Sequence, residues 1–272
     1  YHGWQTQPDA VTVQETIEKN LSMLLRRDIF IVGAGRTDAG VHAREMVAHF
    51  AIVDKVYDEE TANPDSTEQH YEPVGLTLEE VGFSCENLTF KLNQVLPGDI
   101  YIQKIVPVRD DAHARFSPIA RTYRYYVTLR KPLYDRKYVM RIYEPLDIEL
   151  MNHACAKLFC YEDFTSFSKL HTDVKTNNCK IMEAYWRKEG MPECSTSVPE
   201  ATYVFTIKAD RFLRNMVRAI VGTLIQVGRH RMTIKEFAEV IERKNRCQAG
   251  DSVPASGLFL EEIEYPEEIF EG

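Results

Sequence analysis

Asp38 lies in a loop of small residues, 33–43, directly after a predicted buried strand at 28–32. Small side chains around a carboxylate let a substrate approach it closely. Such a carboxylate can act as a nucleophile or a base if a fixed positive charge keeps it ionised despite burial. The pattern is equally typical of an aspartate that bonds its own backbone in a turn, so the loop alone leaves both interpretations open.

Two familiar sites fit this loop poorly. A dinucleotide-binding fingerprint, G-x-G-x-x-G, requires glycine where this chain has Asp38, and it requires a helix directly afterwards. An aspartic protease would need a second copy of the loop from a dimeric partner and an all-β fold. No helix start follows the loop, and the helices predicted on either side of it do not suit an all-β protease, so both interpretations are weak.

Arginine and tyrosine alternate along a predicted strand at 121–129. Side chains on a strand point to opposite faces in turn, so Arg121, Tyr123 and Tyr125 share one face. Such a face suits stacking on an unstacked base beside its phosphate. Tyrosine is also a common strand residue, and an ordinary half-buried strand is the alternative.

A helix is predicted from about 211 to 227, with an apolar side that suits core packing. At about 100° per residue, Arg211, Arg214 and Arg218 fall within one narrow sector of that helix. Because arginine keeps its charge at any cytosolic pH, one of them could pair with a buried aspartate. The alternative is a solvated helix face.

No metal or nucleotide cofactor is predicted. The eight histidines lack metal-binding spacing, no P-loop occurs, and the six cysteines contain no C-x-x-C pair. Scattered cysteines in a chain of this size indicate free thiols in a reducing compartment, so we expect a cytoplasmic protein. The chain also contains neither a signal peptide pattern nor an apolar stretch of the roughly 18 residues that would cross a membrane.

The charge is distributed unevenly along the 272 residues. The net charge is −8, but residues 54–90 carry −9 and the tail from Glu261 carries −6, which leaves +7 on the rest. Most of that positive charge lies at 114–138 and 211–231. Since a phosphate backbone responds to the local field, an RNA site is compatible with the acidic total, although solvated basic faces would look the same.

Helical and strand patterns alternate twice along the chain, which predicts an α+β protein with antiparallel or mixed sheets. We predict an N-terminal domain at 1–108, with the Asp38 loop and an acidic insertion at 54–86, and a C-terminal domain at 109–272. The further predicted elements are helices at 12–25, 87–96, 147–159 and from 233, and strands at 46–52, 100–106, 181–188 and 202–208.

Taken together, these segments resemble the TruA family of tRNA pseudouridine synthases. The most specific block is G-R-T-D-A-G-V-H-A at 35–43. The other matching segments are 121–125, 212–218, 1–8, 12–14, 92–97, 114–117, 163–167 and 254–258, in the family's order. The acidic segment 54–86 is longer than the family pattern leads us to expect.

The resemblance implies two α+β domains that share a mainly antiparallel sheet, with the active site in a central cleft. It also implies a homodimer that binds tRNA and isomerises uridine to pseudouridine in the anticodon stem-loop, at tRNA positions 38–40, without a cofactor. A non-catalytic tRNA-binding or RNA chaperone module is the alternative, and an aspartate-based hydrolase is a weaker one.

The resemblance also implies roles for single residues. Asp38 would be the nucleophile or base, Tyr123 would stack on the flipped base and act in proton transfers, and Arg218 would pair with Asp38. Arg36 would help to extrude the uridine and fill the space it leaves. The remaining substrate-binding residues would be Thr37, His42, Arg115, Arg121 and Arg214.

Overall fold

The computed structural model describes residues 1–57, 71–169, 176–190 and 201–270. They divide into two compact units. Unit 1 comprises Tyr1–Gly35, Val47–Phe116 and Glu267–Gly272, and unit 2 comprises Arg36–Met46 and Ser117–Pro266. This division differs from the predicted domains, because the Asp38 loop groups with the C-terminal part of the chain and the last residues group with the N-terminal part.

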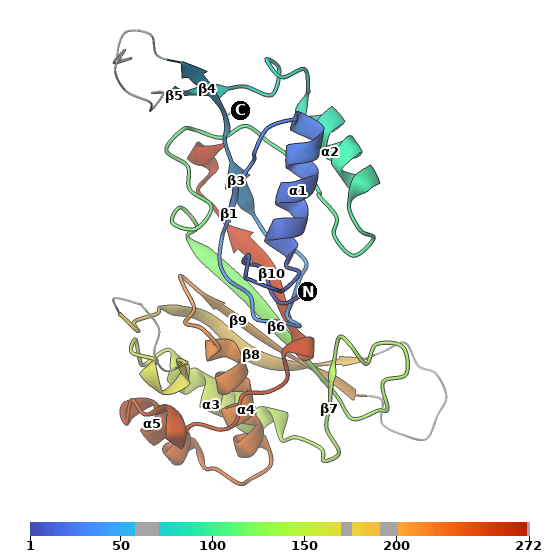
Figure 1. Cartoon of the computed structure of the whole chain (residues 1–272). Helices are drawn as coiled ribbons and strands as arrows, with labels where there is room; N and C mark the ends of the chain where they lie inside the picture. Colours follow the sequence, from blue (N-terminus) through green and yellow to red (C-terminus); the bar gives the residue numbers. More distant parts are fainter. Residues whose placement is uncertain (58–70, 170–175, 191–200, 271–272) are drawn as a thin grey trace. The chain divides into compact units, whose positions relative to one another are not determined.

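Unit 1 contains two helices and two small antiparallel sheets (Figure 1). Its elements are α1 Val13–Leu25, β1 Ile31–Gly33, β3 Ala48–Phe50, β4 Ile52–Tyr57, β5 Tyr71–Leu76, α2 Cys85–Val95 and the short 3-10 helix Glu267–Ile269. Helix α1 begins as predicted, because the hydroxyl of Thr12 accepts the backbone N–H of Glu15 at 3.3 Å. Strand β1 pairs with β3, and β4 pairs with β5.

One prediction in unit 1 needs correction. Segment 100–106 is not a strand, because the side chain of Asn93 in α2 bonds both the N–H and the C=O of Ile102, each at 2.8 Å. These side-chain bonds replace the ladder that a strand would form. The antiparallel strands β4 and β5, in which Ile52 lies opposite Leu76, overlap the segment predicted as an acidic insertion.

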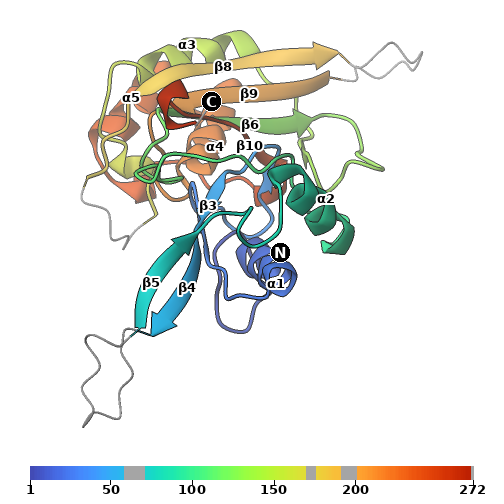
Figure 2. The same ribbon diagram turned by 90° about the horizontal axis from the view of Figure 1, so that it is seen from above.

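Unit 2 is built on a six-stranded sheet, in which Figure 2 shows β8, β9, β6 and β10 side by side. The strands are β2 His42–Ala43, β6 Ala120–Thr128, β7 Met140–Arg141, β8 Ile181–Gly190, β9 Ala201–Ala209 and β10 Leu258–Glu264. Their order is β2-β10-β6-β9-β8, and β7 pairs with β6. The pairings are antiparallel except β10 with β2 and β6 with β7.

Three helices pack on one face of this sheet (Figure 1): α3 Ile148–Leu158, α4 Met216–Gly228 and α5 Ile234–Glu242. Three short 3-10 helices, Thr165–Phe167, Arg246–Gln248 and Ala255–Gly257, connect the elements. Helix α5 begins where the sequence predicts a helix, from 233, because Thr233 and Glu236 form a capping box. Helix α4 begins five residues later than predicted, because Asn215 has φ 67° and interrupts helical geometry.

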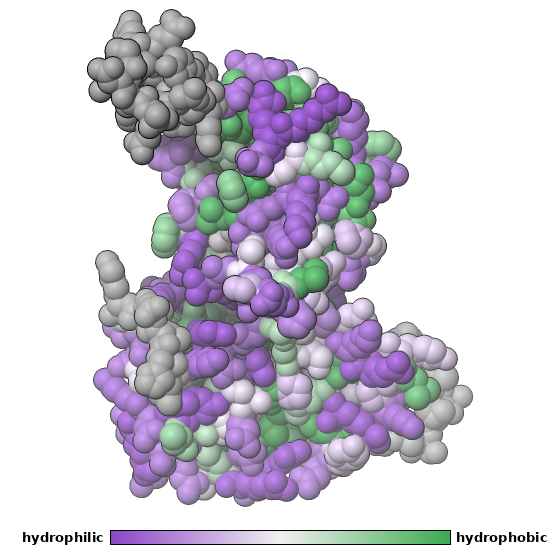
Figure 3. Space-filling model, in the orientation of Figure 1, coloured by the Kyte–Doolittle hydropathy of each residue, from purple (hydrophilic) through white to green (hydrophobic). Residues whose placement is uncertain are grey.

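The predicted α+β class is confirmed. We expected one sheet shared by both domains. Among the described residues, β1 and β3 instead form a two-stranded sheet of their own and do not pair with a strand of unit 2. The buried core of unit 2 includes large side chains from both the sheet and the helices, such as Phe205, Phe167 and Phe237. Figure 3 shows mainly hydrophilic residues on the face it presents, with hydrophobic ones in small groups.

Candidate active site

The loop that carries Asp38 contains a tight turn. The backbone N–H of Val41 donates to the C=O of Asp38 at 3.2 Å, and Gly40 has φ 78°. A type II turn requires positive φ at its third position, where glycine is favoured. The turn therefore uses the main chain of Asp38 and leaves its carboxylate to bind other groups.

Two arginines contact that carboxylate. Arg218 Nη1 lies 3.1 Å from Asp38 Oδ2, and Arg214 Nε lies 3.5 Å from Oδ1. The side chains of Asp38 and Arg218 are 28% and 20% exposed, whereas that of Arg214 is 55% exposed. All three residues belong to unit 2, so Asp38 and its two cations meet within one unit.

The position of Arg218 is set by the segment before β10. Its Nε donates to the C=O of Val253 at 2.7 Å, and the N–H of Val253 donates to the C=O of Arg218 at 3.2 Å. This segment reaches α4 because Gly222 has no side chain, since a Cβ there would lie 1.8 Å from the carbonyl oxygen of Asp251. The sequence gives no signal for a carbonyl contact, although a glycine within a helix suggests a close approach.

The arginines do not form the predicted helical stripe. Arg211 and Arg214 precede α4, and only Arg218 lies in the helix. Asn215, which separates Arg214 from the helix, adopts the left-handed conformation and bonds the hydroxyl of Ser252 at 2.6 Å. The contact of Arg214 with Asp38 therefore depends on this bend and not on helical periodicity.

Tyr123 lies on β6 and is influenced by the same carboxylate. Its ring meets Phe212 edge-on, with ring centroids 5.0 Å apart and an angle of 83°. Burial raises the pKa of Tyr123 to about 12; the charge of Arg121 lowers this pKa and that of Asp38 raises it. The phenol is therefore neutral at physiological pH.

The neighbouring Tyr125 has a different environment. It is fully buried, and its hydroxyl donates to the C=O of Pro254 at 2.8 Å. The ring packs against Gly257, where an added Cβ would lie 2.8 Å from it. Burial also raises the pKa of Tyr125. This tyrosine thus fixes the segment before β10 against β6.

The other predicted substrate-binding residues have different local environments. Arg36 is exposed and Thr37 half-buried, and neither makes a hydrogen bond or ion pair with another described residue. Arg121 Nη1 donates to the C=O of Asp210 at 3.0 Å. Arg115 belongs to unit 1, where its guanidinium lies 5.7 Å from the ring of Phe116.

His42 is engaged elsewhere in unit 2. Its Nε2 lies 2.9 Å from the carbonyl oxygen of Lys137, and its ring is 4.8 Å from Phe259 and 4.9 Å from Tyr138. These contacts involve none of Asp38, Tyr123 and Arg218, so the structure does not bring His42 into the Asp38 group.

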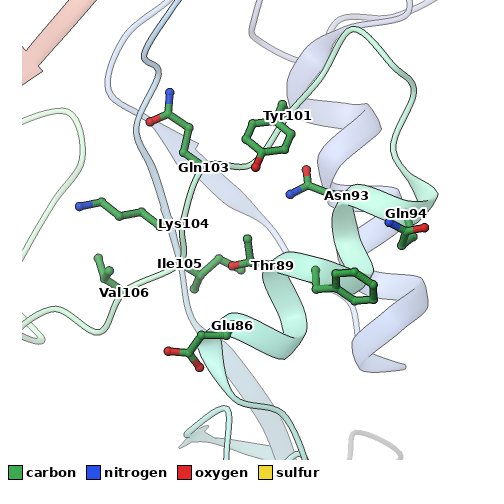
Figure 4. A pocket seen from close by; sticks show the side chains of 10 residues that line it. Glu86, Thr89, Asn93, Gln94, Tyr101, Gln103, Lys104, Ile105 and Val106 are labelled. Atoms are coloured by element: carbon green, nitrogen blue, oxygen red, sulfur yellow. The ribbon is translucent and has the colours of Figure 1, made fainter.

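Unit 1 contains a separate hollow of about 530 Å³. Figure 4 shows Thr89, Asn93 and Gln94 from α2 beside Tyr101 and Gln103 from the following segment. None of the predicted site residues lines this hollow.

The described part of the chain shows no group of three or more His, Cys, Asp or Glu side chains that could hold a metal ion. Five cysteines in it are free thiols, namely Cys85, Cys155, Cys160, Cys179 and Cys247. Within the same part, no helix has the length and apolar character needed to span a membrane.

Comparison with known proteins identifies the class of enzyme to which the chain is similar. The family model described as tRNA pseudouridine synthase matches residues 154–266. Proteins named tRNA pseudouridine synthase A are similar over nearly the whole chain. The one from Bacteroides fragilis is 51% identical over 271 residues, which cover 100% of this chain and 94% of the relative.

The similarity extends to more distant bacteria. The relative from Parabacteroides distasonis is 52% identical over 99% of this chain and 93% of its own length. A relative from Escherichia coli is 35% identical over 98% of this chain and 86% of its own length. The chain therefore belongs to the TruA family of tRNA pseudouridine synthases, which are isomerases.

Proposed function

We propose that the protein isomerises uridine to pseudouridine in the anticodon stem-loop of tRNA, at tRNA positions 38–40. The observation that supports this function best is the carboxylate of Asp38, held 3.1 Å from Arg218 in an enzyme of this family. The proposal names the nucleotide and the residues, which the family membership alone does not specify.

The reaction rearranges one nucleotide without a second substrate. The bond between N1 of uracil and C1′ of the ribose breaks, and a bond between C5 and C1′ forms. The proton that leaves C5 is replaced by one on N1, so atoms and electrons balance. Because the base is detached during the reaction, the site must hold it and exclude water.

Asp38 is the nucleophile or base of this reaction. Arg218 stabilises its negative charge, and the carbonyl of Val253 fixes the direction of the guanidinium. Arg214 adds a second, more exposed positive charge. The arrangement thus supplies a half-buried carboxylate beside two positive charges.

Tyr123 stacks on the flipped uracil and takes part in the proton transfers at C5. Its edge-on contact with Phe212 holds the ring in place, and its neutral phenol adds no charge that would repel Asp38. Moving a base out of its stack costs a few kcal/mol of free energy. Stacking on Tyr123 offsets part of that cost.

Arg36 fills the space that the flipped uridine leaves in the RNA. It is exposed and has no partner among the described side chains, so no existing contact must break before it binds RNA. Thr37 and Arg121 contact the nucleotide beside it, and Arg115 and His42 contact other parts of the tRNA. The two positive charges at Arg36 and Arg121 suit the phosphates.

The proposed enzyme is a homodimer, as the family resemblance implies, and it lies in the cytoplasm, as the scattered cysteines indicate. Sedimentation of the purified protein tests the oligomeric state, and a single species with the mass of one chain, 31.5 kDa, would contradict the dimer.

Release of tritium from tRNA labelled at C5 of uridine tests the activity. The wild-type protein should release the label, and Asp38→Asn should release none. Asp251→Asn is a matched control, since it makes the same change at an exposed aspartate of unit 2. Equal release by wild type and Asp38→Asn would reject the role of Asp38. Salt-dependent tRNA binding without any release would instead indicate a non-catalytic RNA-binding module.

A further inference from the structure

Unit 2 contains a cavity of about 150 Å³ that no proposed step uses. Three aromatic rings line it, from Tyr126, Tyr138 and Phe259, together with the charged side chains of Arg44 and Asp135. Aromatic walls with a few polar groups are typical of ligand sites.

The rings surround Phe259 on β10. Tyr126 meets Phe259 edge-on at 5.2 Å, and the rings of Tyr138 and Phe259 are 6.4 Å apart. The Arg44 guanidinium lies 5.7 Å from the Phe259 ring. These rings already contact one another, and His42 stacks on Phe259 at 4.8 Å, so a base must stack on a ring that remains exposed, and Tyr138 is 49% exposed. Stacking on an exposed aromatic face or a guanidinium plane is available to every base.

The walls of the cavity are held by specific contacts. The N–H of Tyr138 donates to the C=O of Asp135 at 2.8 Å, and the side chains of Arg130 and Asp135 form an ion pair. On the other side, Glu261 pairs with Arg44 at 3.3 Å and with Arg124 at 3.1 Å. The loop after β6 and the strand β10 are thus held in place without a ligand.

The loop that contributes Asp135 and Tyr138 to the cavity is basic. Lys131, Arg136 and Lys137 lie on the same loop and are exposed, and the side chain of Arg44 is 60% exposed. The side chain of Asp135, the one acid of the loop, is 37% exposed. Positive charges around an aromatic cavity complement a base whose phosphates lie outside it, and a carboxylate accepts hydrogen bonds from an exocyclic amine.

The cavity also lies close to Asp38 along the chain. Arg44 follows Asp38 by six residues, and the two lie in one unit. Six residues span no more than ~20 Å, a distance that a short stretch of RNA strand covers. One RNA strand could therefore reach both places.

We propose that this cavity binds a second unstacked base of the same tRNA whose uridine enters the Asp38 site. The inference rests on the proposed function and names a further contact with its substrate. The base stacks on the exposed ring of Tyr138 at this cavity, and its flanking phosphates lie on the basic loop. The second contact would hold the tRNA in position while the uridine reacts.

Tyr138→Ala tests this contact, and Tyr134→Ala is a matched control on the same loop. Tyr138 lines the cavity and is 49% exposed, whereas Tyr134 is 95% exposed and does not line it. Removing a stacking ring should raise the Kd for tRNA by about tenfold or more. Tyr138→Phe, which keeps the ring, should bind like wild type, and so should Tyr134→Ala.

Thermal unfolding of the variants identifies any loss of fold, and cross-linking of tRNA to the wild-type protein by ultraviolet light provides a second readout. A nucleotide adduct on Tyr126, Tyr138 or Phe259 supports the inference. Adducts on none of the three, or equal Kd values for Tyr138→Ala and Tyr134→Ala, would overturn it. Both readouts measure binding, so a wild-type protein that binds tRNA without isomerising it would reject the proposed function and not this contact.

Discussion

Replacement of Arg218 by methionine tests the central ion pair. Methionine keeps much of the apolar stem of arginine but removes the guanidinium. The change takes away the bond to Asp38 at 3.1 Å and the bond to the carbonyl of Val253 at 2.7 Å. Of the two arginine contacts that the described residues make with its carboxylate, Asp38 then keeps the one with Arg214, at 3.5 Å.

The expected loss follows from burial. The side chains of Asp38 and Arg218 are 28% and 20% exposed, so their charged hydrogen bond is worth about 1.5–3 kcal/mol. If that stabilisation acts in the transition state, the rate falls roughly 10- to 150-fold. Arg214 is 55% exposed, and an exposed pair contributes about 1 kcal/mol or less. Arg214→Met should therefore slow the reaction by about fivefold at most.

Single-turnover tritium release at saturating enzyme measures both variants against wild type. Arg218→Lys serves as a further control, because it keeps the charge and should recover part of the rate, although an ammonium cannot reproduce the forked geometry. An equal loss of rate in Arg214→Met and Arg218→Met would contradict the predominance of the Arg218 ion pair. A rate of Arg218→Met within twofold of wild type would also contradict it.

Three further predictions concern ionisation and packing. Because burial raises the pKa of Tyr123 to about 12, the tyrosinate absorbance of Tyr123, which Tyr123→Phe removes, should appear near pH 12 rather than pH 10. The stabilisation of the folded protein by this raised pKa should be present up to pH 10 and lost toward pH 12. Ionisation of Tyr123 near pH 10 would contradict the prediction. Burial, and to a smaller extent the charge of His113, lowers the pKa of His49 below 6.5. The contribution of His49 to the stability of the folded protein is therefore present above pH 6.5 and lost as the pH falls through this lowered pKa. The melting temperature should therefore fall less in acid for His49→Gln than for wild type, and parallel curves would disprove this. Gly222→Ala should destabilise the protein by about 1–3 kcal/mol and slow the reaction, because the added Cβ would clash with the carbonyl oxygen of Asp251. An unchanged melting temperature would contradict this, because it would mean that the segment with Asp251 moves away freely.

Local patterns in the sequence predicted several elements well. Helix α5 begins at the capping box of Thr233 and Glu236, and α3 matches its predicted range closely. These features depend on residues within one or two turns of each other, so the sequence carries the whole signal. The block around Asp38 likewise indicated the family, because it is specific and contiguous.

Elements that depend on distant partners were predicted less well. Segment 100–106 has the composition of a strand, but Asn93 bonds its backbone instead. Helix α4 starts after Asn215, whose side chain bonds Ser252. In both cases a side chain from another segment decides the outcome, and periodicity contains no information about it.

Residue types and their spacing were enough to predict the α+β class, the apolar helix faces and the chemical groups available for catalysis. The three-dimensional fold decided which arginines meet Asp38, because the carboxylate and Arg218 are 180 residues apart. It also decided that a carbonyl of Val253 directs that guanidinium, and that His42 packs against Phe259 instead. A contact of this kind depends on how strands and loops pair across the fold, and residue types alone do not specify that pairing.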